Sequence, residues 1–141
     1  GREQGLMPAE EFSLPLRVYI EDTDAGGIVY YVNYLKFMER ARTEFMRQLG
    51  FGKDYIFNHD LMFVVRDAAI RYLAPALLDD ELEATARIAS LGGASITFAQ
   101  TVRRAGQELA AGELTIACVD RGGVKPRRMP KEMTGRLASV Q

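Results

Sequence analysis

The chain of 141 residues has few zinc-binding side chains, with one cysteine, Cys118, and one histidine, His59. A single cysteine cannot form an intrachain disulfide, and two such residues are too few for a Cys/His zinc site. A Ser–His–Asp or Cys–His catalytic group would need His59, which lies in the polar segment 57–60, a segment typical of an exposed turn. We therefore expect no disulfide and no bound metal, and we do not assign catalysis to His59.

Long hydrophobic runs and an excess of charge are also lacking. The longest apolar runs, 28–32 and 61–65, are five residues each, whereas about 20 are needed to span a bilayer. The net charge is −1, so no global field attracts nucleic acid or an anionic membrane. The first fifteen residues contain no apolar stretch of the kind found in secretory signals. We expect a cytoplasmic protein with no membrane span and no nucleic acid partner.

The rest of the composition, 48% hydrophobic and 26% charged, is typical of one globular domain with its own core. Residues 1–15 mix charge, glycine and two prolines without a sustained period. We expect a flexible N-terminal lead-in over these residues. Residues 16–141 are then expected to form the single domain.

One long amphipathic helix is expected after a short strand and a glycine-containing loop. Apolar and polar residues alternate over 16–21, which predicts a half-buried strand. After the loop 22–27, Asn33 is expected to cap a helix over 34–49, because apolar residues recur there at helical spacing. Gly50 is the expected stop signal of this helix.

The second half of the chain has the pattern of strands separated by short turns. The expected strands are 62–74, 82–88, 94–103 and 113–120. The last of them has apolar residues on both faces, so we expect a central strand covered on both sides. The predicted fold class is α+β, with one long helix on an antiparallel sheet of about five strands. An exposed edge of such a sheet is commonly paired with a second copy of the chain.

The loop before the helix gathers groups that can act on a carbonyl. Segment 19–34 contains three carboxylates, Glu21, Asp22 and Asp24, together with a glycine pair and the start of the helix. The free N–H groups of a helix start can hold the charge that develops on a carbonyl oxygen, while an aspartate activates water or attacks the carbon.

Two other interpretations of this loop remain open. Asp22 and Asp24 can be ordinary turn residues, with Asn33 only capping the helix, and composition alone favours this interpretation. The two aspartates can also hold a divalent cation. Such cations take six or more oxygen ligands, and only Glu21 is near in sequence, so the metal interpretation is the weaker one.

Five segments of the chain resemble the 4-hydroxybenzoyl-CoA thioesterase family of hotdog-fold proteins, and most closely its Tol-Pal-associated acyl-CoA thioesterases. The segments are EDTDAGGIVYYVNY (21–34), ERARTE (39–44), FVVR (63–66), YLAPA (72–76) and KPRRMP (125–130). The resemblance implies a hotdog fold, in which an antiparallel sheet wraps one long helix. It also implies a homodimer or homotetramer with active sites at the dimer interface, acting on acyl-CoA without a cofactor.

The resemblance also implies roles for individual residues. Asp24 takes the position of the catalytic aspartate, a nucleophile or general base, and the backbone N–H of Tyr31 takes that of the oxyanion donor. The Tol-Pal-associated members have a histidine where this chain has Tyr31. A tyrosine with a pKa near 10 is a poor base at neutral pH, but its backbone N–H is unaffected. The implied substrate-binding positions beside them are Gly26, Gly27, Val32 and Asn33.

Basic residues are concentrated near the C-terminus. Segment 121–136 contains six basic residues and one acidic residue, Glu132. The basic residues are Arg121, Lys125, Arg127, Arg128, Lys131 and Arg136. By the resemblance, Lys125 and Arg127 match positions that contact the phosphates of CoA, and Arg128 is their neighbour. Phosphate binding by lysine and arginine suits this interpretation. A solvated tail is the alternative.

The sequence thus predicts an acyl-CoA thioesterase. A thioesterase acting on acyl carrier protein is a second possibility, in which the basic segment docks an acidic protein and activity depends on salt. A non-catalytic acyl-thioester binding module is a third, because a fold does not determine its chemistry. In that third case the turnover would be indifferent to the substitution Asp24→Asn.

Overall fold

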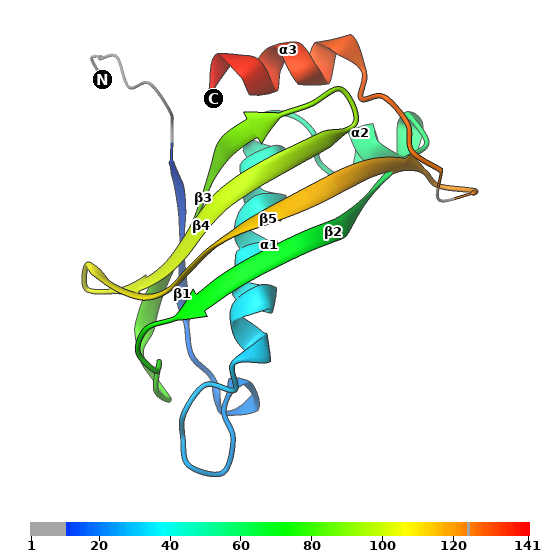
Figure 1. Ribbon diagram of the computed structural model, residues 1–141. Helices are drawn as coiled ribbons and strands as arrows, with labels where there is room; N and C mark the ends of the chain where they lie inside the picture. The colour runs from blue at the N-terminus through cyan, green and yellow to red at the C-terminus, as the bar shows by residue number, and fades with distance from the viewer. Residues whose placement is uncertain (1–10, 124) are drawn as a thin grey trace.

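The computed structural model describes residues 11–123 and 125–141. Over these residues the chain forms a five-stranded antiparallel sheet, in the order β1-β3-β4-β5-β2, and three α-helices (Figure 1). The strands are β1 (Phe12–Arg17), β2 (Leu61–Tyr72), β3 (Glu81–Leu91), β4 (Ser95–Arg104) and β5 (Gln107–Asp120). The helices are α1 (Val32–Gln48), α2 (Lys53–Asn58) and α3 (Lys131–Ser139).

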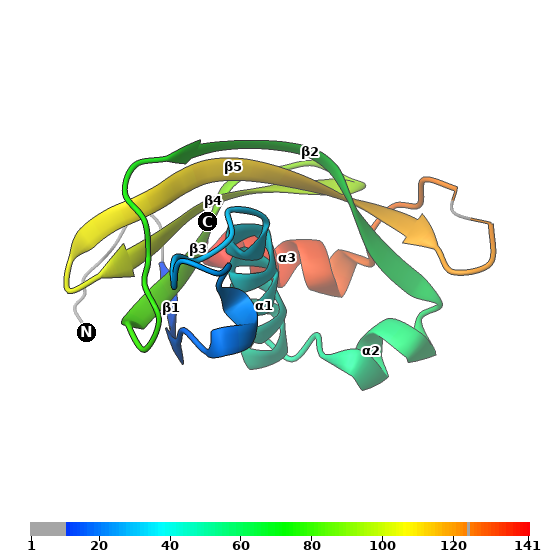
Figure 2. The same ribbon diagram turned by 90° about the horizontal axis from the view of Figure 1, so that it is seen from below.

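The sheet curves over α1, as Figure 2 shows. This helix has 17 residues, a length of about 26 Å at 1.5 Å per residue. It packs mainly on β3, β1 and β4. Its inward stripe includes Phe37, Met38, Ala41 and Phe45, all buried against the sheet. The predicted α+β class and hotdog fold, a long helix wrapped by an antiparallel sheet, are confirmed.

The first strand differs from the prediction at both ends. It begins at Phe12 and ends at Arg17, so the predicted boundary between residues 15 and 16 falls inside β1. Pro15, which suggested a break, is tolerated because β1 is an edge strand and proline has no N–H to donate. The chain then turns through a short 3-10 helix, Ile20–Asp22, where a strand was expected. Residues 1–10, the rest of the predicted lead-in, lie outside the described residues.

The start of α1 also differs from the prediction, whereas its end agrees. Asn33 was expected to cap the helix, but the helix begins at Val32 and Asn33 lies in its first turn. At the other end Gly50 has a φ of +98°, the left-handed conformation expected of a glycine after a helix.

The sequence pattern did not reveal the two short helices or the full extent of β5. β5 begins at Gln107 and lies between β4 and β2. The predicted central position of this strand is confirmed. On its second face Val119 is buried and Ala117 half-buried, but Glu113 is exposed. The prediction of cover on both sides therefore holds only toward the end of the strand. In the C-terminal segment, α3 buries Met133 and Leu137 completely, so this segment is not a solvated tail.

We expect Gly112→Ala to weaken the pairing of β5 with β2. Gly112 pairs with Ile70, and a Cβ atom at this position would lie 2.4 Å from the carbonyl oxygen of Ala69. The backbones would have to separate, at a cost of about 1–3 kcal/mol in the free energy of unfolding. Urea unfolding monitored by circular dichroism measures the change.

Gly135→Ala is the matched control. Gly135 lies inside α3, and a Cβ atom there meets nothing within 4 Å. Because alanine favours a helix over glycine, this variant should be as stable as the wild type or more stable by about 0.5–1 kcal/mol. Equal stability of Gly112→Ala and the wild type would contradict the close approach of β2 and β5.

Candidate active site

The loop between the 3-10 helix and α1 is a narrow turn held by its own backbone. The N–H of Asp24 donates to the carbonyl of Ile28 (3.0 Å), and the N–H of Tyr30 donates to the carbonyl of Asp22 (3.2 Å). At the tip, Gly27 has a φ of +77° and donates its N–H to the carbonyl of Asp24 (3.1 Å). This conformation suits glycine, so the glycine at position 27 shapes the loop.

The two aspartates of the loop have different surroundings. Asp22 is buried, and its Oδ2 accepts the N–H of Tyr19 (2.9 Å). Asp24 is exposed, and its Oδ1 accepts the N–H of Gly26 (2.9 Å). Within the described part of the chain, Oδ2 of Asp24 has no hydrogen-bond partner. Both residues are thus turn residues, as one interpretation expected, but only Asp24 also presents a free carboxylate oxygen to solvent.

The start of α1 presents two free backbone donors. The N–H of Asn33 donates to the carbonyl of Tyr30 (2.8 Å), and that of Tyr34 donates to the carbonyl of Tyr31 (3.2 Å). The N–H groups of Tyr31 and Val32 have no partner among residues 11–123 and 125–141. Both residues are exposed. An anionic oxygen at this point is stabilised by the free donors and by the positive end of the helix.

Asn33 holds the loop against the helix. Its side chain is buried, and Nδ2 donates to the carbonyl of Asp22 (2.7 Å). This hydrogen bond joins the first turn of α1 to the loop that carries Asp24. In this structure the side chain of Asn33 therefore positions the loop.

We expect Asn33→Ala to lower kcat by about tenfold while changing KM little, because it misplaces Asp24 relative to the Tyr31 amide. The lost hydrogen bond should also reduce the free energy of unfolding by about 1 kcal/mol. Steady-state kinetics and urea unfolding measure the two effects. Asn58→Ala, at the exposed end of α2, is the control. A stability loss with kcat unchanged would leave Asn33 with a structural role alone.

Tyrosines form a cluster beside the free donors. The ring of Tyr31 lies 5.0 Å from that of Tyr30 and 5.7 Å from that of Tyr72, which also lies 5.5 Å from Tyr34. The hydroxyl of Tyr34 accepts the N–H of Ala76 (2.9 Å). Burial and the neighbouring Tyr31 and Tyr34 raise the pKa of Tyr72, so its hydroxyl stays protonated at neutral pH. A cavity of about 290 Å³ opens here, lined by Tyr31, Tyr34 and Tyr72 with Val29, Leu73, Ala74 and Pro75.

The three side chains predicted to contact phosphate differ in how many partners they already have within the chain. Arg127 donates to the backbone carbonyls of His59 (2.6 Å) and Asp60 (3.0 Å), so its guanidinium is already engaged at the start of β2. Arg128 lies against Gly93, where a Cβ atom would come within 2.9 Å of its Nη2. The ammonium group of Lys125 has no partner in the part of the chain that the structure describes.

Two further cations of the basic segment are anchored on aromatic rings. The guanidinium of Arg121 lies 4.1 Å from the ring centroid of Phe57, and that of Arg136 lies 5.6 Å from the ring centroid of Phe51. These contacts stabilise the packing around α2. They leave Lys125, Arg128 and Lys131 as the more available cations for an anionic ligand.

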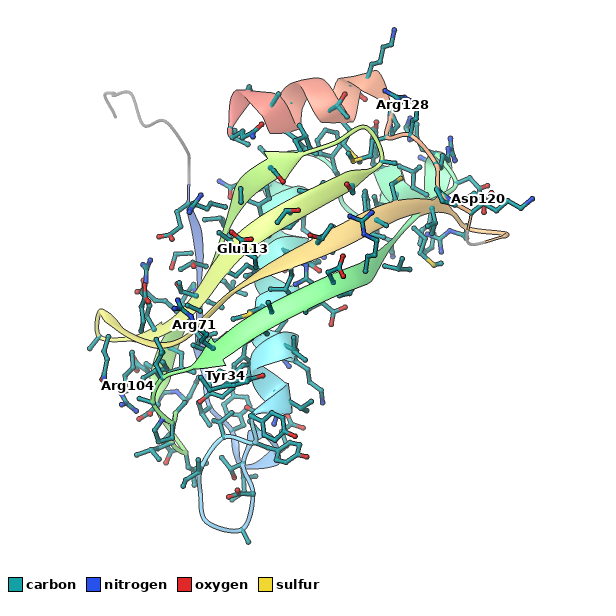
Figure 3. The ribbon with its side chains drawn as sticks, viewed as in Figure 1. Tyr34, Arg71, Arg104, Glu113, Asp120 and Arg128 are labelled. Carbon is teal, nitrogen blue, oxygen red and sulfur yellow. The ribbon has the colours of Figure 1, made fainter. Side chains whose placement is uncertain are left out.

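One chain does not bring the two groups of predicted residues together. Tyr31 packs on Tyr72, the last residue of β2, whereas Arg127 bonds to His59 and Asp60, directly before the strand begins. The 12 residues of this strand span about 36 Å at about 3.3 Å per residue. Figure 3 shows the same separation, with Tyr34 near the start of α1 and Arg128 at the other end of the sheet.

A second cavity, which the sequence analysis missed, lies between α1, α2 and the inner face of β2. Its volume is about 420 Å³. Arg42, on its wall, is only 7% exposed and donates from Nη1 to Oε1 of Gln100 (3.0 Å). Burial lowers the pKa of Arg42 and the nearby Glu39 opposes this, and an arginine remains charged at neutral pH. Two signals pointed here: an arginine within the apolar helix stripe and a glutamine among the inward residues of β4.

The described residues contain no cluster of three or more histidine, cysteine, aspartate or glutamate side chains placed to hold a metal ion. In the same residues we find no helix of the length and hydropathy needed to cross a membrane. The metal interpretation of Asp22 and Asp24 thus gains no third ligand within the described ranges, and the two carboxylates serve separate turns.

Comparison with known proteins identifies the family. Residues 18–137 match the profile of the thioesterase-like superfamily. The acyl-CoA thioesterase YbgC of Haemophilus influenzae is 46% identical over 123 residues, 86% of this chain and 90% of that protein. The acyl-CoA thioester hydrolase YbgC of Escherichia coli is 44% identical over 127 residues, 89% and 95% of the two chains. A probable thioesterase from Bartonella henselae superposes with a TM-score of 0.82 at 35% identity, covering 86% of this chain and 100% of that one. The chain therefore belongs to the thioesterase-like superfamily, as its sequence motifs predicted.

Proposed function

We propose that the protein is an acyl-CoA thioesterase that hydrolyses its substrate to a free acid and CoA. The observation that carries the proposal is the pair of free N–H groups, at Tyr31 and Val32, on a loop and helix start that also present Asp24. An oxyanion donor and a carboxylate are two groups that can catalyse acyl transfer to water. The curated relatives with 46% and 44% identity are named for this same activity.

The reaction follows from these groups. The thioester oxygen accepts the N–H of Tyr31, which polarises the carbonyl and holds the negative charge of the tetrahedral intermediate. Asp24 either attacks the carbonyl carbon or removes a proton from the attacking water. The carbon–sulfur bond then breaks and the thiolate of CoA leaves and takes up a proton. If Asp24 attacked, water hydrolyses the resulting anhydride and restores the carboxylate.

A second copy of the chain completes the site in this proposal. β2 is an edge strand, and among the described residues its only paired strand is β5. If two β2 strands pair antiparallel over their full length, Tyr72 of one subunit lies opposite Leu61 of the other. The Asp24 loop of one subunit then approaches the basic residues of its partner, and one active site is built from two chains.

The centre of β2 suits such pairing. Arg66 and Asp67 lie at its midpoint, where Nε of Arg66 is 3.3 Å from Oδ2 of Asp67. A two-fold axis between them would place each arginine opposite the partner's aspartate, and opposite charges across a strand pair are favourable. The proposal therefore includes a homodimer, or a homotetramer made of two such dimers, with the active sites at the dimer interface.

Lys125, Arg127 and Arg128 of the partner subunit are proposed to bind the phosphates of CoA. Lys125 and Arg128 contribute most, because the guanidinium of Arg127 already holds two carbonyl groups. Gly26 and Gly27 shape the loop at the thioester, and Val32 supplies the second free amide. The proposal places the enzyme in the cytoplasm, consistent with its lone cysteine, Cys118, a buried free thiol.

Free-thiol release from short, long and aromatic acyl-CoAs tests the proposal. The protein should hydrolyse at least one class, and the same acyl group on acyl carrier protein should be a poorer substrate. Faster, salt-sensitive hydrolysis of the carrier ester would instead favour docking of an acidic protein on the basic segment. Binding of acyl-CoA without any thiol release would contradict the proposed activity.

A further inference from the structure

The cavity between α1, α2 and β2 combines apolar walls with a buried cation. Met46, Phe63 and Ile116 are among its lining residues, and its volume is about 420 Å³. This lies within the range of small-molecule sites. The cavity extends to Phe63 and Val65 in the first half of β2. In the proposed dimer this end of β2 faces the Asp24 loop of the partner subunit.

Arg42 forms no ion pair with a described residue, although the charge of Glu39 on the same helix acts on it. Its side chain is 7% exposed, yet no carboxylate lies within 4 Å of it among residues 11–123 and 125–141, and its only hydrogen bond goes to the neutral amide of Gln100. A guanidinium carries five N–H donors, so most of the hydrogen-bond donors of Arg42 are unused. A buried charge is costly unless it is paired. The unpaired charge therefore points to an anionic ligand.

The fold holds Arg42 in place. Nε2 of Gln100 donates to the carbonyls of Met38 (2.9 Å) and Thr85 (3.0 Å). These two hydrogen bonds fix the amide of Gln100, so that its Oε1 accepts from Arg42. The guanidinium is thus anchored at one nitrogen and keeps the others for a ligand, which is the arrangement of a preorganised site.

The rest of the lining supports an anion. Arg47 and Lys53 also line the cavity, so three cations face one carboxylate, that of Glu39. Arg47 forms an ion pair with Glu44. If Arg47 is left out because of that pair, Arg42 and Lys53 still give two positive charges against the one negative charge of Glu39. An anion that enters between the apolar walls therefore meets a net positive surface.

We propose that this cavity binds an acyl group that ends in a carboxylate, with Arg42 as the residue that contacts it. The substrate class is a monothioester of CoA with a dicarboxylic acid. This inference rests on the proposed function, because the thioester end of the substrate is held by Asp24 and Tyr31 of the partner subunit. The methylene groups of the acyl chain pack on Met46, Phe63 and Ile116, and the terminal carboxylate accepts two hydrogen bonds from the guanidinium.

Matched pairs of substrates test the inference. Butyryl-CoA is compared with succinyl-CoA, hexanoyl-CoA with adipyl-CoA, and octanoyl-CoA with suberyl-CoA, so that each pair differs only in the terminal carboxylate. The wild type should have a higher kcat/KM for the dicarboxylic member of at least one pair. In Arg42→Met that preference should fall by about 10- to 100-fold, the loss expected for hydrogen bonds between charged groups. Arg42→Lys, which keeps the charge, should lie between the two.

The control is Arg40→Met, which removes the same charge from the same helix. Arg40 is exposed and does not line this cavity, so the substrate preference should stay that of the wild type. A wild type that prefers the monocarboxylic member at every length would overturn the inference. So would an Arg42→Met variant with an unchanged preference.

Binding of free acids separates this inference from the proposed function. If no CoA ester is hydrolysed, the proposed function fails, but the cavity is still testable without turnover. Adipate or suberate should raise the Tm of the wild type more than hexanoate or octanoate does, and this difference should vanish in Arg42→Met. Equal shifts by the two kinds of acid in the wild type would overturn the inference, whether or not the variant folds.

Discussion

Asp24→Asn should lower kcat at least about a hundredfold, because an amide neither attacks a thioester nor takes a proton from water. The fold should be unaffected, since the asparagine oxygen can still accept the N–H of Gly26 that Oδ1 of Asp24 accepts now. KM should change little. Thiol release from the best acyl-CoA substrate, measured side by side with the wild type, gives both constants.

Glu21→Gln is the control for Asp24→Asn. Glu21 is the other exposed carboxylate of segment 19–34, and the loss of its charge should leave turnover near that of the wild type. If Asp24→Asn turns over as fast as an active wild type, Asp24 has no part in the mechanism and another residue must supply the carboxylate. If the wild type itself is inactive, a binding module becomes the better interpretation.

Mixing two inactive variants should restore activity if each site draws on two chains. One variant is Asp24→Asn, and the other is the double variant Lys125→Glu with Arg128→Glu. The second should lose about a hundredfold in kcat/KM, because two charge-assisted contacts to phosphate become repulsive. In a mixed dimer one site carries every substitution and the other carries none.

The expected recovery has a definite size. Random mixing makes half of the dimers mixed, and each has one intact site of two, so activity should return to about a quarter of the wild-type value. The variants are refolded together from denaturant, and the assay uses substrate well below KM. If each site were built from a single chain, every site in the mixture would be defective. An activity of the mixture no greater than the mean activity of the two variants assayed separately would therefore contradict a shared site.

Sequence reasoning located the helix and the strands in which apolar residues follow a clear local pattern. α1 follows from its apolar spacing and from Gly50. The strand that begins at Leu61 follows from its β-branched and aromatic content, and β3 and β4 follow from alternation. The errors occur where tertiary contacts decide the local structure. Asn33 has the composition of a cap but bonds to Asp22 from inside the helix. The segment of α3 looks polar, yet two well-spaced residues, Met133 and Leu137, are enough to dock it on the core.

The parts of the candidate site differ in how far sequence could predict them. Asp24 and Tyr31 are seven positions apart, on one tight loop and the helix start that follows it, so a local sequence pattern contains both. Arg42 and Gln100 are 58 positions apart, and only the packing of α1 on β4 joins them. The separation of Tyr31 from Arg127 within the chain is set by the length of β2, and no local pattern contains the proposed pairing with a second chain.

The two unpaired amides at the start of α1 have a consequence for the free protein. A capping side chain takes the amides of the second and third helical residues, and in α1 those of Asn33 and Tyr34 already donate to the carbonyls of Tyr30 and Tyr31. A capping residue would therefore leave the amides of Tyr31 and Val32 unpaired. Both residues are exposed, so water is the acceptor for these amides in the free protein. In the proposed reaction the thioester oxygen replaces that water, and the helix loses no hydrogen bond of its own when the substrate binds.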